Sequence, residues 1–346
     1  MGRVLILHTG GTIGCRASSE GQKPDPDFST LLRQRLTDSG EPDLPLFDVI
    51  ELHQLIDSAN LTPAHWAQIA GLLVIHWQDY DGFLILHGTD TMAYTASALS
   101  FMLLAQDRPV ILTGSQIPLS ERRSDGLDNL INSLHLCQTP GLAEVCVYFN
   151  GRLLRGNRTT KLKATELDAF ASPNLPPLGV AGIRMELDQR LLLPAIPLRF
   201  RIPAFDAEAV TVLSLYPGIT ARAARALLDD ERVRGVVMLS FGVGNPPDAN
   251  IELMQVLEEA VARGVVIVNR THCLYGKVDQ STYATGNTLT RIGVTPGGDL
   301  TLEAAFAKLH FLLALGTSPE QIRNMMLHSI RGEVQGPEGG LLSVSP

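Results

Sequence analysis

The stretch Val4-Leu-Ile-Leu7, which runs directly into Thr9-Gly-Gly-Thr-Ile-Gly14, decides the fold prediction. Four apolar residues that end in a glycine-rich turn are typical of a buried strand in a parallel α/β sheet. The runs Phe83–Leu86, Val110–Leu112 and Val145–Phe149 repeat this pattern farther along the chain. Strands that alternate with helical periodicity predict an α/β fold. The helical patterns here cover residues 92–104 and 125–136.

A second set of strands and helices follows a proline-rich stretch at residues 173–203. Proline fixes φ and lacks an N–H donor, so this stretch cannot form a central strand or a long helix. We interpret it as a linker that could include an edge hairpin. Beyond it, the expected strands are 210–215, 236–239 and 265–268, and the expected helices are about 219–228, 250–263 and 302–314.

We therefore expect two α/β domains, each built on a parallel sheet. The predicted boundaries give a larger N-terminal catalytic domain over residues 1–190, a linker over 191–209 and a smaller C-terminal domain over 210–346. A chain of 346 residues is long enough for two separate cores.

Composition excludes several functional classes. The formal net charge is −8, and Lys and Arg do not cluster, so we expect no nucleic-acid partner. The apolar runs fall far short of the roughly 18 residues of a membrane helix, and we expect no membrane association. The N-terminus carries no signal-peptide pattern, and the four cysteines show no disulfide framework, which favours a cytoplasmic protein with reduced thiols.

Unusual polar residues stand where three predicted strands end. Thr9-Gly10, Gly88-Thr89 and Thr113-Gly114 are threonine–glycine pairs, and ligands of open α/β sheets bind beyond the carboxyl ends of strands. Each alone has a simpler explanation, as a phosphate-binding loop or a helix cap. No Walker motif and no metal-ligand spacing accompany them, so we expect neither a cofactor nor a metal. We predict that His87 is a packing residue. A lone lysine is usually a solvated surface residue, and Lys161 is a candidate site residue only because two threonines precede it.

Taken together, these segments resemble the bacterial-type L-asparaginase family, in particular its cytoplasmic (type I) branch. The resemblance spans nearly the whole chain in family order. Its motifs are Thr9–Gly14, His87-Gly-Thr-Asp-Thr-Met92, Thr113-Gly-Ser-Gln-Ile-Pro118, Arg155-Gly-Asn-Arg-Thr-Thr-Lys161, Phe241-Gly-Val-Gly-Asn245 and Tyr283-Ala-Thr-Gly-Asn287.

The resemblance implies hydrolysis of asparagine to aspartate and ammonia through a covalent acyl-enzyme. Thr12 corresponds to the nucleophile, and Thr89, Asp90 and Lys161 correspond to its supporting triad. A threonine hydroxyl needs an adjacent base, and a lysine can serve only in its neutral form. The residues implied to bind substrate are Asp57, Ser58, Ala59, Gly88, Thr89, Asp90 and Ser115. Asn245 is a further candidate, either for contact with the substrate or for an interface between subunits.

Two positions depart from the family pattern. The usual tyrosine after the nucleophile corresponds to Gln22, which cannot share a phenolic proton. We therefore expect weaker activation of Thr12 beneath a mobile lid over residues 15–26. Ala59 replaces a residue that is polar in many members. Thr160 and Cys273 could belong to a regulatory asparagine site, although Leu239 stands where that site needs an arginine.

Two alternatives to an asparaginase stay open. One is a glutaminase or amidotransferase subunit that supplies ammonia to a tRNA-linked reaction, and the other is an asparagine sensor without turnover. The resemblance also implies a homo-oligomer, either a homodimer or a homotetramer. Asparagine would be its small-molecule partner.

Overall fold

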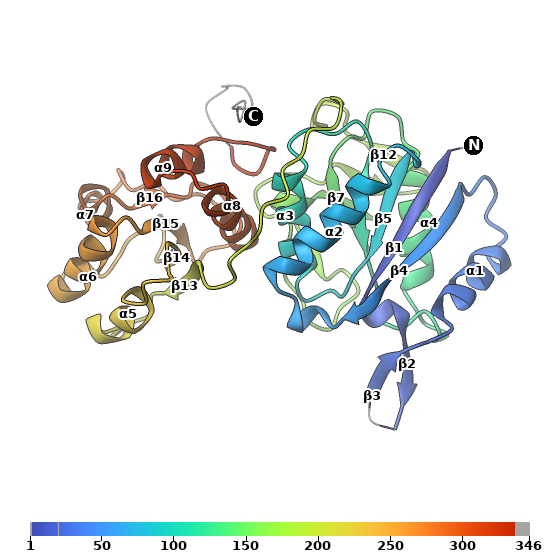
Figure 1. Ribbon diagram of the computed structural model, residues 1–346, viewed down its shortest axis with the longest axis horizontal. Coiled ribbons are helices and arrows are strands. Elements are labelled where there is room, and N and C mark those ends of the chain that lie inside the picture. The colour runs from blue at the N-terminus through green and yellow to red at the C-terminus, as the bar shows by residue number, and fades with distance from the viewer. Residues whose placement is uncertain (1, 20, 336–346) are drawn as a thin grey trace. The chain divides into compact units, whose positions relative to one another are not determined.

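The computed structural model describes residues 2–19 and 21–335, and the chain divides into two compact units, Met1–Ile202 and Pro203–Pro346. The first unit is built on an eight-stranded mixed sheet (Figure 1). In spatial order its strands are β12 (Met185–Leu187), β11 (Gly179–Ala181), β8 (Arg152–Arg155), β7 (Val145–Phe149), β6 (Val110–Thr113), β5 (Gly82–Leu86), β1 (Arg3–Gly10) and β4 (Leu46–Ile56).

We predicted a parallel sheet for this unit, and that prediction is wrong for the three strands at one edge. The five strands from β7 to β4 are parallel, whereas β8, β11 and β12 add in antiparallel fashion. β8 follows β7 after only Asn150 and Gly151, and so short a connection can join only antiparallel strands. β11 and β12 lie in the proline-rich stretch and form the expected edge hairpin.

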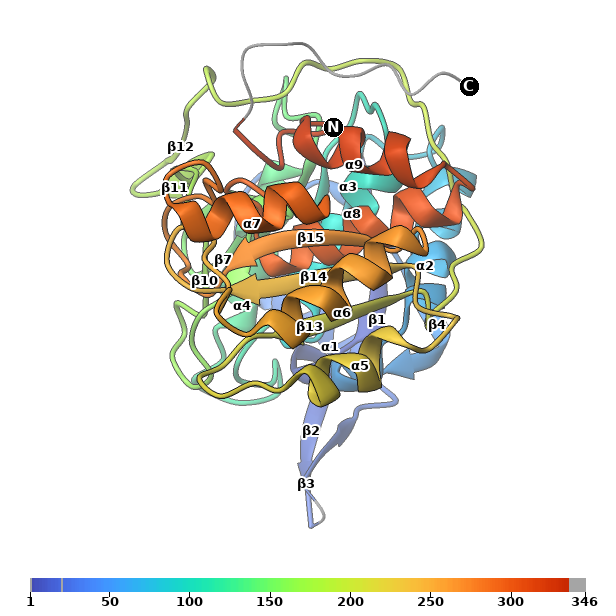
Figure 2. The ribbon, with the colours of Figure 1, turned by 90° about the vertical axis from the view of Figure 1, so that its left-hand side faces the viewer.

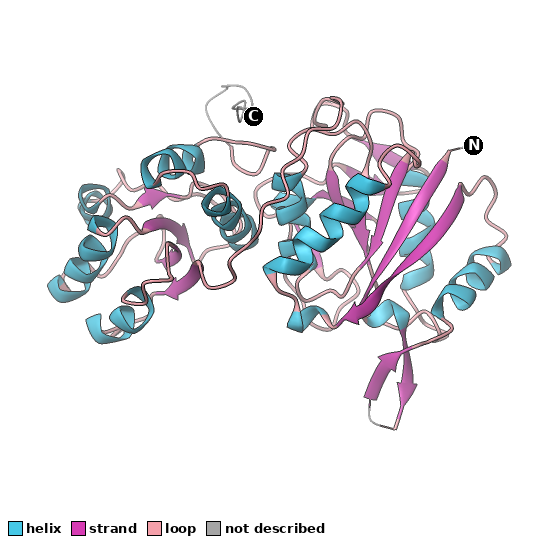
Figure 3. Cartoon of the chain, in the orientation of Figure 1, coloured by secondary structure: helices cyan, strands magenta, loops and turns pink. Residues whose placement is uncertain are grey.

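Helices cover both faces of the sheet (Figure 3). On one face, apolar residues of β1, β5 and β6 pack with α1 (Phe28–Asp38) and α4 (Gly126–Leu136) in one buried cluster. α2 (Pro63–Ile75) and α3 (Met92–Met102) contact each other, and α3 packs on β6 and β7. Ten of the eleven residues of α3 are buried, because it packs against α2 as well as against the sheet. The predicted strands and the helices at 92–104 and 125–136 are thus confirmed within a few residues.

A two-stranded hairpin projects from the first unit (Figure 3). It consists of β2 (Cys15–Ser18) and β3 (Gly21–Pro24), where we predicted a lid loop. A short antiparallel pair, β9 (Thr160–Lys161) with β10 (Phe170–Ala171), follows β8 and carries Lys161. Three 3-10 turns complete the unit: η1 (Thr12–Gly14), η2 (Ser58–Asn60) and η3 (Gly156–Arg158).

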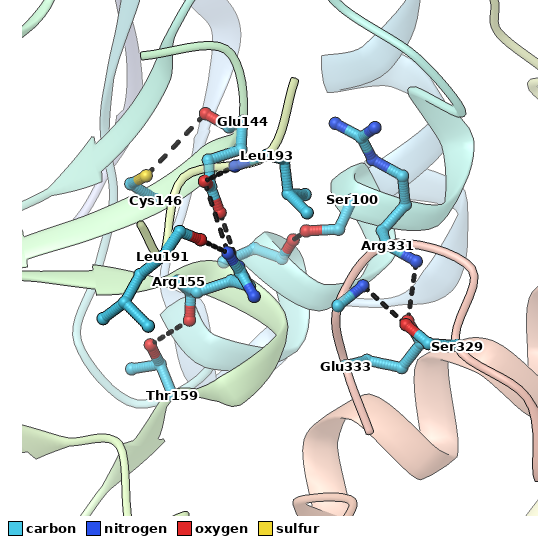
Figure 4. Close-up of polar contacts among 12 residues, drawn as sticks. Ser100, Glu144, Cys146, Arg155, Thr159, Leu191, Leu193, Ser329, Arg331 and Glu333 are labelled. Carbon is cyan, nitrogen blue, oxygen red and sulfur yellow. Dashed lines mark hydrogen bonds and ion pairs between the residues drawn. The ribbon is translucent and has the colours of Figure 1, made fainter. Parts of the chain in front are cut away.

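A buried ion pair beside β7 and β8 holds residues 191–193 in place within the first unit (Figure 4). Arg155 Nε lies 2.6 Å from Glu144 Oε2, and the two side chains are only 7% and 2% exposed. Glu144 Oε1 accepts a hydrogen bond from the Leu193 N–H at 2.9 Å, and Arg155 donates to the Leu191 carbonyl. Charged groups removed from water need such partners, and the start of the predicted linker supplies them.

The second unit contains a parallel four-stranded sheet in the order β13 (Val210–Ser214), β14 (Gly235–Ser240), β15 (Val266–Thr271) and β16 (Thr295–Pro296). One side of this sheet carries α5 (Ala221–Leu228), α6 (Ile251–Ala262) and α7 (Ala284–Ile292), which face the viewer in Figure 2. α8 (Leu302–Ala314) and α9 (Pro319–Leu327) pack against the strands as well as each other. The prediction of a smaller parallel-sheet domain is confirmed.

Among the described residues, none of the helices combines the length and the apolar composition that a membrane-spanning segment needs.

Candidate active site

The ends of three adjacent strands meet at the C-terminal edge of the first sheet. β1 lies between β4 and β5 and pairs in parallel with both, so residues that follow the three strands converge. Glycines permit very close approach there. A Cβ on Gly10 would stand 2.2 Å from the Ile56 carbonyl oxygen, and one on Gly88 would stand 2.4 Å from Ser58 Oγ. These positions therefore need glycine for packing, beside any catalytic role.

A cavity of about 280 Å³ opens where these strand ends meet. Among the residues predicted for the site, Thr12, Asp57, Ser58, Thr89 and Asp90 line it. The described residues that complete its lining are His8, Gly10, Gly11, Gly14, Cys15, Gln22, Pro24, Leu55 and Ile56.

Thr12 is the first residue of η1, directly after two glycines with positive φ. Gly11 has φ of +91°, and a Cβ there would stand 2.4 Å from the Gly88 backbone nitrogen. Only glycine tolerates both the conformation and the contact. The turn holds Thr12 half-buried at the cavity wall.

Lys161 joins the cavity through two hydrogen bonds. Its Nζ donates to Thr89 Oγ1 at 2.8 Å and to Asp90 Oδ1 at 2.7 Å. The Lys161 side chain is 19% exposed, while that of Asp90 is 61% exposed and open to a ligand. Thr89 donates onward to Gln116 Oε1 at 3.3 Å. The structure thus brings Thr89, Asp90 and Lys161 together, as the resemblance implies.

Gln116 was not among the predicted site residues, yet it connects three segments. Its side-chain nitrogen donates to the carbonyls of Ala164 and Glu166, and its backbone N–H donates to the carboxylate of Asp125. The strand-end Thr113–Gln116 run could have indicated it. A polar residue after a buried strand is the signal.

The remaining predicted residues have different environments. Asp57 accepts a hydrogen bond from the Ala59 N–H at 3.2 Å and caps η2, so Ala59 contributes its backbone. Ser58 is buried, and its carbonyl accepts from Thr91 Oγ1 at 2.8 Å. Ser115 is buried after β6 and is not among the residues lining the cavity. Asn245 belongs to the second unit, where its Oδ1 accepts from Thr285 Oγ1 at 2.9 Å.

The residues considered for a regulatory site differ in burial and lie in different units. Thr160 is buried in β9, and Cys273 is exposed in the second unit. Leu239 pairs across the sheet with Arg270, which is buried. The four cysteines are free thiols. Within the described parts of the chain, no three His, Cys, Asp or Glu side chains converge in a way that could hold a metal ion.

Two buried histidines stand at the ends of neighbouring strands. Burial lowers the pKa of His87 to about 4, and its ring nitrogens meet the Gly88 carbonyl at 2.7 Å and Thr95 Oγ1 at 2.9 Å. His87 is thus the satisfied packing residue that we predicted. Burial also lowers the pKa of His8 to about 4, against a smaller opposing effect of Glu51. His8 lines the cavity, although it was not among the predicted site residues.

Comparison with known proteins agrees with this architecture. Residues 3–193 match the family described as Asparaginase, N-terminal, and residues 209–326 match the Glutaminase/Asparaginase C-terminal domain. The chain belongs to the asparaginase family. This confirms the resemblance seen in the strand-end motifs, including its type I branch.

Individual relatives cover almost the full chain. L-asparaginase 1 of Escherichia coli K12 is 46% identical over 334 residues, which cover 96% of this chain and 97% of that protein. The crystal structure of L-asparaginase I from Vibrio cholerae has a TM-score of 0.87 at 43% identity and covers 96% of this chain and 99% of its own. The thermostable L-asparaginase from Thermococcus kodakarensis has a TM-score of 0.87 at 32% identity, over 97% and 100% of the two chains.

Proposed function

We propose that the protein is an L-asparaginase that converts asparagine to aspartate and ammonia through a threonine acyl-enzyme. The observation that carries the proposal is the double hydrogen bond of Lys161 to Thr89 and Asp90, beside a cavity that Thr12 lines. The family membership and the full-length similarity to L-asparaginase 1 of Escherichia coli support the same activity.

In the first half-reaction, Thr12 Oγ1 attacks the side-chain amide carbon of asparagine. The C–N bond breaks, and ammonia leaves with the proton that the threonine hydroxyl gave up. Backbone N–H groups of the turns around Gly11 and Gly88 are the proposed donors to the tetrahedral oxyanion, and such donors are a large catalytic contribution. In the second half-reaction, water adds to the ester, the C–Oγ1 bond breaks, and a proton returns to Thr12. The carboxylic acid that forms gives its proton to ammonia.

Asp90 has two proposed partners in this cycle. In the structure its Oδ1 lies 2.7 Å from Lys161 Nζ. The exposed oxygen is suited to the α-ammonium group of a bound substrate. With the substrate cation on Asp90, Lys161 is the proposed base for Thr89.

We propose that Asp57, Ser58 and the Ala59 backbone contact the α-amino and α-carboxylate ends of the substrate. Asp57 and Ser58 line the cavity, and Ala59 N–H already faces the Asp57 carboxylate. The predicted contributions of Ser115 and Asn245 stay predictions. A cytoplasmic location and a homodimer or homotetramer likewise remain proposals, drawn from the similarity to type I enzymes.

Ammonia release tests the function directly. The wild type and Thr12→Ala are assayed with L-asparagine, L-glutamine and D-asparagine, and binding is followed by calorimetry. An asparaginase releases ammonia fastest from L-asparagine, and Thr12→Ala loses that activity while it still binds the substrate. Faster release from L-glutamine would favour the ammonia-supplying subunit. Tight asparagine binding by the wild type with no ammonia would favour the sensor and refute the enzyme.

A further inference from the structure

His8 occupies an unusual position in the first unit. It lies on β1 in the same alternation as Val4 and Ile6, which point into the core cluster that α1 covers. Its ring packs against Phe28 with centroids 4.4 Å apart and the ring planes tilted by 40°, and the residue has no exposed surface. It nevertheless lines the cavity together with Thr12, and it is the one imidazole among the described lining residues.

Neither ring nitrogen of His8 has a hydrogen-bond partner among the described residues. The contrast with His87 is direct, because that buried imidazole uses both nitrogens within the protein. A buried polar group without a partner is destabilising, and native proteins seldom leave one. The cavity is the space from which a partner for His8 can come.

The edge of the His8 ring lies against the turn that carries the nucleophile. A Cβ on Gly14 would stand 2.5 Å from His8 Cε1 and 2.6 Å from Nε2, so glycine is needed there. Gly14 ends η1, which Thr12 begins. Burial keeps the imidazole neutral near pH 7, with Glu51 across the strand pair as the charged group that opposes this effect. A neutral imidazole has one donor and one acceptor nitrogen.

We propose that His8 is a positioning residue that holds, through a ring nitrogen, the water molecule that attacks the acyl-enzyme on Thr12. The inference rests on the proposed asparaginase activity and refines its second half-reaction. The water oxygen forms the new bond to the acyl carbon, and the bond to Thr12 Oγ1 breaks. His8 orients the water and undergoes no net change. Gln22 also lines the cavity, but it lies on β3 of the hairpin and has no part in this step.

The test compares His8→Phe with His8→Asn. Phenylalanine keeps a ring of similar size beside Phe28 but has no nitrogen, whereas asparagine keeps a donor and an acceptor. We expect His8→Phe to lower kcat by about 10²-fold, because misplacing a reacting group has this order of effect, and to lower KM with it, because a slow second half-reaction lets the acyl-enzyme accumulate. His8→Asn should recover at least about tenfold of that loss. In His8→Ala, added imidazole should restore activity, while it should not do so in His8→Phe.

The step that slows is identified by trapping. Acid quench and mass spectrometry should show an aspartyl adduct on Thr12 accumulating in His8→Phe and not in the wild type. Hydroxylamine, a nucleophile that does not need the held water, should increase product release from the variant. His310→Phe, a buried histidine beside Phe306 in the second unit, is the matched control and should keep kcat.

The proposal is overturned if His8→Phe keeps its kcat and changes only the melting temperature, or if kcat falls without accumulation of the adduct. If His8→Phe does not fold, the response of His8→Ala to imidazole and the kcat of His8→Asn decide the question in the same way. An absence of ammonia release by the wild type would instead refute the underlying asparaginase activity.

Discussion

Lys161 donates a hydrogen bond of 2.8 Å to Thr89, although the two residues stand 72 positions apart in the chain. β9 brings the lysine and the turn after β5 brings the threonine, so the contact exists only in the folded first unit. The same ammonium group contacts Asp90, the residue next to Thr89. One cation therefore fixes the orientation of both side chains at the cavity.

Removal of that cation should impair catalysis far more than folding. Lys161→Met is expected to lower kcat by about 10²–10⁴-fold, the usual contribution of a positioned acid or base. Lys161→Arg should recover little, because a guanidinium does not lose its proton. Steady-state ammonia release measures the effect. Lys163→Met removes a half-exposed partner of Asp168 and is the control, with kcat within about twofold of the wild type. Equal losses in both variants would contradict the role of Lys161.

Replacement of Gln22 by tyrosine should raise turnover. Gln22 lines the cavity from β3, and the amide cannot share a proton with Thr12 as a phenol can. We expect kcat of Gln22→Tyr to rise by up to about tenfold, at the low end of acid–base contributions. Lys23→Tyr adds the same ring at the adjacent exposed position, which does not line the cavity, and should leave kcat unchanged. A kcat for Gln22→Tyr that is equal to or below the wild-type value would show that the position is not limiting.

The buried ion pair of Glu144 and Arg155 should contribute to the free energy of unfolding. Arg155→Met leaves a carboxylate buried without its ion partner and is expected to reduce the free energy of unfolding by about 3–5 kcal/mol. Glu144→Leu combined with Arg155→Met leaves no uncompensated charge. That double variant should be less destabilised than the sum of the two single variants, as measured by urea unfolding. Additive losses would mean that the pair contributes no coupling.

Stability should also fall on mild acidification. Burial holds the pKa values of His8, His87 and His310 at about 4 in the folded protein, against an ordinary value of 6.5. Between these values the unfolded chain binds more protons than the folded one, so the free energy of unfolding decreases as pH falls from 6.5 toward 4. The slope is up to about 1.4 kcal/mol per pH unit for each histidine.

Urea denaturation between pH 5 and pH 7 isolates this effect from most carboxylates, which titrate lower. His310→Phe removes one titrating group and should flatten the slope by about a third. A stability that stays constant across this pH range would show that the three histidines titrate alike in the folded and unfolded chains.

The central strands were predictable because burial leaves a clear pattern. Every residue of β5 and β7 is buried, and their continuous apolar runs show it. β4 escaped prediction, although it is the longest strand of the sheet. Within the described sheet it pairs with β1 alone, and apart from the buried Leu52 its residues are partly buried or exposed. Asp48, Glu51 and His53 interrupt its apolar pattern. A strand at a sheet edge does not need a continuous apolar run.

The site divides in the same way. That Thr12, Thr89 and Asp90 lie at the cavity could be predicted because they follow strands within recognisable motifs. Lys161, the last residue of a further motif, could be predicted to lie beside them. His8 could not, since a single imidazole at the end of an apolar strand is as compatible with the interior as with a site. Its significance depends on what surrounds the ring, and Phe28 and Gly14 come from outside the strand. Gln116 depends likewise on the distant carbonyls of Ala164 and Glu166.

The close fit of Gly10 against Ile56, and of Gly88 against Ser58, makes the cavity a product of three strands at once. None of β1, β4 and β5 encloses it without the other two. A partly folded sheet would therefore lack this cavity altogether. During denaturation, enzyme activity should disappear in the same cooperative transition as the sheet itself, and during biosynthesis it can begin only after all three strands have paired.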